Sequence, residues 1–333
     1  MEQAEDLLLD IQHVHTAFRL GDDYYDALDD INLTLNKNEI LAIVGESGSG
    51  KSTLATSVIG LHNPKNTRTT GNILYNDLDL VGLNETLYNR IRGNDIGMIF
   101  QDPLAALNPL MRIGEQIEET LLYHTKMTAS QREERVLELL GQVGIPNPKR
   151  VARQYPHELS GGMRQRIVIA VAIACKPPII IADEPTTALD VTIQAQILDL
   201  LEDIQRETES GIILITHDLG VVAETADRVA VMYAGQIVEQ GTVQAVFEHP
   251  LHPYTRSLLR SMPQADTDDD ELHVIQGTVP DLKHMQVKSC RFAPRIPWID
   301  ASEHEAEPTM HEVEPGHLVQ CTCYKHFYFE DEK

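Results

Sequence analysis

The residues with the clearest capacity for chemistry form a glycine-rich segment, GESGSGKS at residues 45–52, which fits the pattern G-x-x-x-x-G-K-[ST]. Glycines in such a loop let backbone N–H groups turn toward phosphate oxygens, and a following helix adds the positive end of its dipole. Lys51 would reach the β- and γ-phosphates of a nucleoside triphosphate, and Ser52 would ligate Mg²⁺. A Gly/Ser linker that matches by accident is the alternative. We call residues 45–52 the phosphate-binding loop, and its candidate contact residues, with the next one, are Gly45, Ser47, Gly48, Gly50, Lys51, Ser52 and Thr53.

The segments beside this loop predict the strand and helix that must position it. Residues 40–44 are short, entirely apolar and preceded by polar residues, which is typical of a strand buried on both faces of a parallel sheet. Residues 53–60 read as the start of a helix. A strand, a glycine-rich turn and a helix in this order favour a phosphate site over a linker.

A second apolar strand, predicted at residues 178–182, leads into two adjacent carboxylates, Asp183 and Glu184. A strand buried on both faces delivers charged groups only at its C-terminal end, which is where parallel sheets bind ligands. Asp183 suits the Mg²⁺ shell, and Glu184 could act as the general base for an attacking water. The alternative is a strand end followed by an acidic turn that caps a helix.

The remaining apolar patterns predict an α/β fold with a P-loop NTPase core and a parallel sheet. Alternating residues at 7–18 and 31–35 indicate an antiparallel β subdomain. Helical spacing indicates a helical insert at about residues 102–176. Further strands are expected at 71–75, 96–100, 212–216 and 229–232, and further helices at 113–124, 130–143, 161–175 and 191–206. We expect a nucleotide-binding domain over residues 1–250 and a small C-terminal extension over 251–333.

Composition narrows the class of protein. The 333 residues include 51 Asp and Glu against 27 Lys and Arg, a net charge of −24, which disfavours nucleic acid as a partner. The first ten residues lack the pattern of a signal peptide, and no apolar run approaches the roughly 18 residues of a membrane span. Four cysteines do not suggest a disulfide framework. We therefore expect a soluble chain in a reducing compartment.

Between the two nucleotide motifs, LSGGMRQ at residues 159–165 resembles the signature of the ATP-binding cassette (ABC) ATPases. Read locally, Ser160 is a good N-cap for the helix that follows. The resemblance implies instead that this helix start binds the γ-phosphate of ATP held by an opposite subunit. The signature residues to which the resemblance assigns this contact are Ser160, Gly161, Gly162 and Gln165.

Three further family marks occur in the expected order. Gln101 resembles the Q-loop glutamine, which implies a role in sensing Mg²⁺ and the attacking water. His217 is similar to the switch histidine that contacts the γ-phosphate, and residues 188–190 resemble the D-loop at the dimer interface. The resemblance implies two cassettes that close head to tail on ATP and Mg²⁺, with Ser52, Gln101 and Asp183 as metal contacts and Glu184, His217 and Gln101 as catalytic residues.

An aromatic residue before the phosphate-binding loop is implied to stack on adenine. Phe18, Tyr24 and Tyr25 are all candidates, and Tyr25 is favoured.

Several further segments resemble those of the subfamily of ABC ATPases that energises dipeptide and oligopeptide uptake, which has nickel importers as relatives. They are QDPLAALNPL at 101–110, IGEQ at 113–116, HPLHPYTRSLL at 249–259, CRFAPR at 290–295 and EVEPGH at 312–317. The resemblance implies a peripheral position on the cytoplasmic face of the cell membrane. Its implied partners are a second, different ABC ATPase subunit, two membrane permease subunits and an extracytoplasmic substrate-binding protein. Residues 104–111 would line the groove for a permease helix, or merely pack the insert.

The C-terminal extension of that subfamily often carries four cysteines, which implies an iron-sulfur cluster. Here Cys290 and Cys321 match the outer two, whereas Ile296 and residues 302–304 stand where the inner two are expected, and Cys323 is additional. Three cysteines with a histidine such as His304 could bind zinc or a cluster. We favour a tail held by packing without a metal.

Other functions remain open from the sequence. A nickel or other small-solute importer ATPase would share these motifs. A soluble ABC protein of translation or DNA repair usually carries two cassettes or a coiled-coil insertion, and neither pattern occurs here. A catalytically inactive, regulatory cassette is a further alternative.

Overall fold

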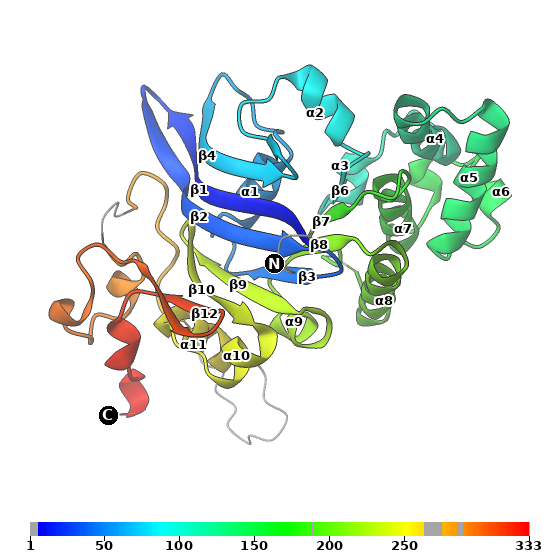
Figure 1. Cartoon of the computed structure of the whole chain (residues 1–333). Coiled ribbons are helices and arrows are strands. Elements are labelled where there is room, and N and C mark those ends of the chain that lie inside the picture. The colour runs from blue at the N-terminus through cyan, green and yellow to red at the C-terminus, as the bar shows by residue number, and fades with distance from the viewer. Residues whose placement is uncertain (1–5, 188, 263–274, 286–288, 333) are drawn as a thin grey trace. The chain divides into compact units, whose positions relative to one another are not determined.

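The computed structural model describes residues 6–187, 189–262, 275–285 and 289–332 (Figure 1). These residues form two compact units, and each unit draws on several stretches of the chain. The first unit comprises Met1–Leu9, Thr34–Ile40 and Tyr75–Ile215. The second comprises Asp10–Leu33, Leu41–Leu74 and Thr216–Lys333.

Parallel strands form the centre of the first unit. β7 (Ile179–Asp183) pairs with β6 (Ile96–Ile99) on one side and β8 (Gly211–Thr216) on the other. Every residue of β7 and β8 is buried, as the continuous apolar runs predict for strands covered on both faces. The crossover between them is α8 (Val191–Thr208), which Asp190 caps by accepting a hydrogen bond from the Ile193 amide. Asp183 is the last residue of β7 and Glu184 follows it, so both carboxylates lie at the C-terminal edge of this parallel sheet, where ligands bind.

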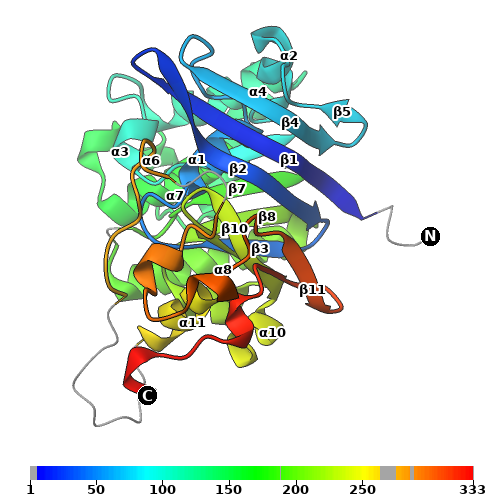
Figure 2. The same ribbon diagram turned by 90° about the vertical axis from the view of Figure 1, so that its left-hand side faces the viewer.

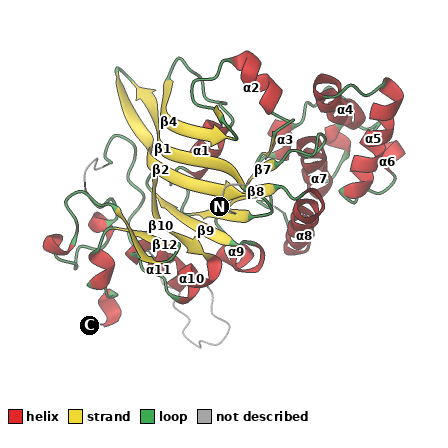
Figure 3. Cartoon of the chain, viewed as in Figure 1, coloured by secondary structure: helices red, strands yellow, loops and turns green. Residues whose placement is uncertain are grey.

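The helical insert follows β6 in the chain. Apolar residues of α4 (Ile113–His124) recur at intervals of four, and α4 packs on α5 (Ala129–Gln142) and α7 (Gly161–Ala172). Thr128 and Gln131 form a reciprocal capping box at the start of α5. Figure 3 shows these helices gathered as one group. The shorter helices of the first unit are α2 (Glu85–Ile91), α3 (Pro103–Ala106), α6 (Pro148–Val151) and η2 (Pro156–Glu158).

Two sheets form the second unit. β1 (Leu7–Leu20) lies between β2 (Asp23–Asn36) and β4 (Thr67–Tyr75) in one of them. In the other, β9 (Arg228–Tyr233) pairs in parallel with β3 (Ile40–Val44) and antiparallel with β10 (Gln236–Thr242). Helices α1 (Lys51–Val58), α9 (Leu219–Thr225), α10 (Val243–Glu248) and α11 (Pro253–Arg260) belong to this unit.

The tail extends the second sheet by a hairpin. β12 (His317–Gln320) pairs antiparallel with β10, and β11 (Met310–Glu314) pairs with β12 (Figure 2). Phe292 and Phe329 of the tail are buried in one apolar cluster with residues of β3 and β9. The C-terminal segment therefore shares the core of the unit that carries the phosphate-binding loop. Short elements complete the chain, namely β5 (Leu78–Asp79), η3 (Ala293–Arg295), η4 (Ala301–Glu303), η5 (Cys323–Lys325) and η6 (Glu330–Glu332).

Some element boundaries differ from those expected. α1 begins at Lys51 rather than at residue 53, because Gly50 adopts a left-handed φ of 108° that starts the helix at once. Residues 236–242 form β10, a strand that is not among those expected from the sequence. The strand runs on because the tail hairpin supplies its second partner. The strands expected at residues 31–35 and 71–75 begin earlier, at Asp23 and Thr67. Most other ends agree within about three residues. Within the described ranges, no helix combines the length and apolarity needed to cross a bilayer.

Candidate functional site

The phosphate-binding loop needs glycine at three positions, for two different reasons. A Cβ on Gly45 would collide with the carbonyl oxygen of Met232, so the backbone passes too close to β9 for any side chain. Gly48 and Gly50 have φ values of 81° and 108°, which L-residues rarely adopt. The glycines of the sequence pattern therefore correspond to a close backbone approach and to left-handed turns.

Lys51 lies inside this loop. Its side chain is 5% exposed, and Nζ donates hydrogen bonds to the carbonyl oxygens of Gly45 at 2.8 Å and Glu46 at 3.0 Å. Ser49 Oγ is also buried and has no hydrogen-bond partner in the described part of the chain. A buried ammonium at a glycine-rich helix start can be stabilised by an anion, so the loop fits a phosphate group. Ser47, Gly48 and Ser52 are exposed at its surface, and Thr53 is half-buried.

Two side chains of the tail brace the loop from within the second unit. Tyr254 Oη accepts a hydrogen bond from the Glu46 amide at 2.8 Å, and burial raises the pKa of Tyr254, which keeps its hydroxyl neutral. Arg295 donates to the Glu46 carboxylate at 2.6 Å, with only 4% of its side chain exposed. Sequence reasoning missed both residues, because contacts across more than 200 positions leave no local pattern.

At the end of β7, Asp183 is buried and Glu184 is half-buried. Glu184 has a φ of 46°, a conformation that costs a non-glycine residue about 1–3 kcal/mol and is concentrated at functional sites. Its amide donates to the Ile215 carbonyl at 2.9 Å, which holds this turn. Asp183 is the last residue of the strand, whereas Glu184 already lies in the turn, so the two adjacent carboxylates are carried by different backbone conformations.

The structure brings Gln101 and Glu184 together. Gln101 Nε2 donates to Glu184 Oε2 at 2.7 Å, and Thr187 Oγ1 donates to the same oxygen at 2.8 Å. Thr187 was not predicted, although a hydroxyl three residues after a strand-end carboxylate is a local signal. Both donors bind the same oxygen, Oε2, and so hold the carboxylate in place.

The signature segment forms the start of α7. Ser160 is exposed and caps the helix by accepting from the Met163 amide at 3.3 Å. A Cβ on Gly162 would lie 3.1 Å from Ile193, so this glycine lets α7 start close to α8. Gln165 is 2% exposed, and its Nε2 has no partner among the described residues. Ser160 and Gly161 therefore face outward, whereas Gln165 faces the packed interior.

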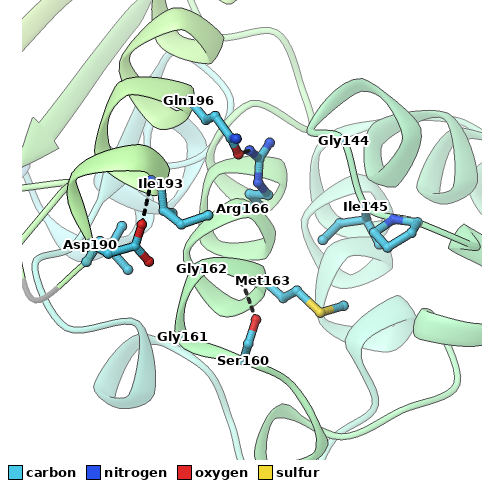
Figure 4. A pocket seen from close by; sticks show the side chains of 12 residues that line it. Gly144, Ile145, Ser160, Gly161, Gly162, Met163, Arg166, Asp190, Ile193 and Gln196 are labelled. Carbon is cyan, nitrogen blue, oxygen red and sulfur yellow. Dashed lines mark hydrogen bonds between the residues drawn. The ribbon is translucent and has the colours of Figure 1, made fainter.

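A cavity of about 470 Å³ opens beside this helix start, within the first unit. Figure 4 shows Ser160 and Asp190 at the starts of α7 and α8, both at its edge. Arg166, which also lines it, donates to the Val143 carbonyl and to Gln196. Of the expected D-loop, Leu189 lines the same cavity, and Ala188 lies outside the described residues.

The other predicted site residues lie in the second unit. His217 is exposed directly after β8, before the cap of α9. Two of the candidate aromatic residues have ring contacts: Cζ of Arg68 lies 3.7 Å from the ring centroid of Tyr24, and the ring of Phe18 meets His62 edge to face. Tyr25 is half-buried and has no ring partner in the described ranges.

Comparison with known proteins places these motifs in a family. Residues 28–187 match the ABC transporter family, and residues 238–298 match the oligopeptide/dipeptide transporter C-terminal region. The chain is 55% identical to the oligopeptide transport ATP-binding protein OppD of Lactococcus lactis subsp. cremoris (strain SK11), over 98% of this chain and 97% of that protein. The chain belongs to the ABC transporter family of ATP-binding proteins. This ABC ATPase is also 52% identical to the dipeptide transport ATP-binding protein DppD of Bacillus subtilis (strain 168), over 87% of each chain.

Solved structures agree with the fold. A dimeric ATP-binding cassette in a post-hydrolysis state, bound to ADP and Pi, superimposes with a TM-score of 0.64 at 30% identity. The match covers 71% of this chain and 99% of that one. The predicted family, α/β fold class and class of enzyme, an ATP hydrolase, are confirmed. The roles of individual residues in this ABC ATPase remain predictions.

Proposed function

We propose that this ABC ATPase binds and hydrolyses ATP to drive an importer of oligopeptides or dipeptides from the cytoplasmic face of the cell membrane. The observation that carries the cargo class is the near full-length similarity to peptide transport ATP-binding proteins, which includes the C-terminal region. A nickel or other small-solute importer is the alternative, because the chain supplies the ATPase and other subunits select the cargo.

The proposed chemistry assigns one task to each residue of the site. Lys51 and the loop amides grip the phosphates, and Glu184 accepts the proton of the attacking water while Gln101 and Thr187 hold its carboxylate. His217 contacts the γ-phosphate. Mg²⁺, when bound, neutralises charge on the phosphates, and Ser52, Gln101 and Asp183 would hold it.

We propose that a second cassette completes the site. Ser160 and Gly161 are exposed at the start of a twelve-residue helix beside the cavity, where backbone N–H groups favour an anion. The proposed anion is the γ-phosphate of ATP bound to the partner cassette. Gln165, being buried, would act by positioning the helix start rather than by touching phosphate.

The remaining proposed partners are two membrane permease subunits and an extracytoplasmic binding protein, and nucleic acid is not among them. Leu104 and Leu110 support the permease contact, because they are 56% and 85% exposed on the segment expected to receive a permease helix. We assign the cassette to residues 1–250, with the insert at about 102–176, and the extension to residues 251–333.

Isolation of the assembled complex tests this proposal. The tagged chain would be purified from detergent-solubilised membranes and its companions identified by mass spectrometry. We expect permease subunits, a second ATPase and a peptide-binding protein, together with ATP-dependent peptide uptake in vesicles. Recovery of ribosomes or DNA without any membrane subunit would overturn the transporter assignment, and a nickel-binding companion would support the alternative cargo.

A further inference from the structure

Four potential metal ligands converge in the tail of the second unit. The ligand atoms of Cys290, His304, Cys321 and Cys323 all lie within 4.8 Å of one another. The three cysteines are buried, with 4%, 1% and 1% of their surface exposed, and none forms a disulfide. They come from three separate segments, so only the fold brings them together.

Packing alone does not account for these polar side chains. Nδ1 of His304 is buried and has no hydrogen-bond partner among the described residues, although buried nitrogen atoms are normally paired. The Glu305 amide donates to Cys321 Sγ at 3.5 Å, the kind of contact that stabilises a thiolate ligand. His304 thus has an unpaired ring nitrogen and lies in one cluster with three buried thiols, and these four side chains can together bind a metal ion.

The donor set and its spacing select the kind of metal centre. Three thiolates and one imidazole form the Cys₃His set of structural zinc sites. Ligands at about 2.3 Å for sulfur and about 2.0 Å for nitrogen around one tetrahedral ion stand about 3.5–3.8 Å apart, inside the observed limit. An iron-sulfur cluster interposes several atoms between its cysteines and needs wider separations. We propose that Cys290, His304, Cys321 and Cys323 bind a single Zn²⁺ ion.

The position of the site gives the ion a structural task. Cys321 and Cys323 follow β12, whereas Cys290 immediately precedes Arg291, so the ion joins the end of the hairpin to the segment 290–295. Arg291 donates to the Ala234 carbonyl and pairs with Asp29. Arg295, five residues after Cys290, pairs with Glu46 of the phosphate-binding loop. The zinc site therefore anchors the segment that braces the nucleotide loop.

Metal analysis of the full chain tests the site independently of transport. The protein would be purified in reductant without chelator, and zinc, iron and acid-labile sulfide would be measured. We expect one zinc per chain, no stoichiometric iron, and a tetrahedral thiolate spectrum when Co²⁺ replaces zinc. Stoichiometric iron and sulfide would overturn the proposal, as would a metal-free chain that fails to bind Co²⁺ under reducing conditions.

Variants locate the ligands. Cys323→Ser and His304→Ala should each weaken zinc binding more than about tenfold, since even changes beyond the ligands typically cost 10–100-fold. Cys175→Ser is the matched control, because Cys175 lies in the first unit, outside the cluster, and should keep full zinc content. Equal zinc content in all four proteins would contradict the assignment. The Co²⁺ spectrum of the wild-type chain decides the matter if a variant fails to fold.

Discussion

The phosphate-binding loop and the signature segment are both glycine-rich starts of helices, but their surroundings differ. Lys51 is almost completely buried, and the loop around it is braced by Tyr254 and Arg295 of the same unit. Ser160 is exposed beside a cavity of about 470 Å³. The loop is thus held by contacts within its own unit, whereas Ser160 of the signature segment is exposed and, under the proposed function, meets the partner cassette.

Glu184→Gln tests the half of the site that performs chemistry, and we expect the largest effect there. Without a general base, ATP turnover in the assembled complex should fall by about 10²–10⁴-fold, while ATP binding is retained and ATP-bound dimers persist. A radiometric phosphate-release assay measures turnover. Glu134→Gln, an exposed carboxylate on α5, is the control and should leave it unchanged. Wild-type turnover in Glu184→Gln would remove Glu184 as the base.

Lys51→Met tests whether the buried ammonium of the loop is needed for the nucleotide. Hydrogen bonds to charged groups contribute about 1.5–3 kcal/mol, so ATP affinity should fall by about 10–100-fold. Equilibrium binding of a fluorescent ATP analogue to the isolated chain measures it. Lys65→Met removes an exposed lysine and should bind normally. Unchanged affinity in Lys51→Met would show that the loop amides suffice.

Ser160→Ala tests the exposed signature segment and shows whether its role differs from that of the phosphate-binding loop. Loss of one hydroxyl contact should lower turnover of the assembled complex by up to about tenfold, with ATP binding to the isolated chain unchanged. The variant also loses a helix cap, which costs about 1 kcal/mol of stability. Thr128→Ala removes the cap of α5 in the same way and serves as the control. Equal losses of turnover in both variants would assign the effect of Ser160 to helix stability.

Arg295→Ala should have the smallest effect, because it acts on the loop through Glu46. Arg295 contacts Glu46 and not the nucleotide itself, so ATP affinity should fall only about two- to fivefold, which corresponds to less than about 1 kcal/mol. Titration of the isolated chain with a fluorescent ATP analogue at low and high salt measures this affinity. Arg206→Ala on α8 removes an exposed arginine and is the control. Removal of the proposed zinc should produce a similar loss. If neither Arg295→Ala nor removal of zinc changes the ATP affinity, the tail is not needed to hold the loop in its binding conformation.

The fold and the site were predictable wherever the signal is local. The spacing of glycines, Lys51 and Ser52 indicates a phosphate loop because the loop geometry is set within eight residues. The apolar run that ends in Asp183 and Glu184 indicates a parallel strand because burial on both faces demands it. β10 was not predicted, since part of its pairing depends on a distant partner, the tail hairpin.

By itself the sequence determined the family, the α/β class and the identity of the groups that could perform chemistry, because short motifs encode backbone geometry and side-chain type. Only the tertiary structure decided that Gln101 donates to Glu184 across 83 positions and that Arg295 reaches Glu46 across 249. It also decided that three cysteines and His304 converge within 4.8 Å. Such contacts depend on how separate elements pack into one core, and no local spacing of residues specifies that packing.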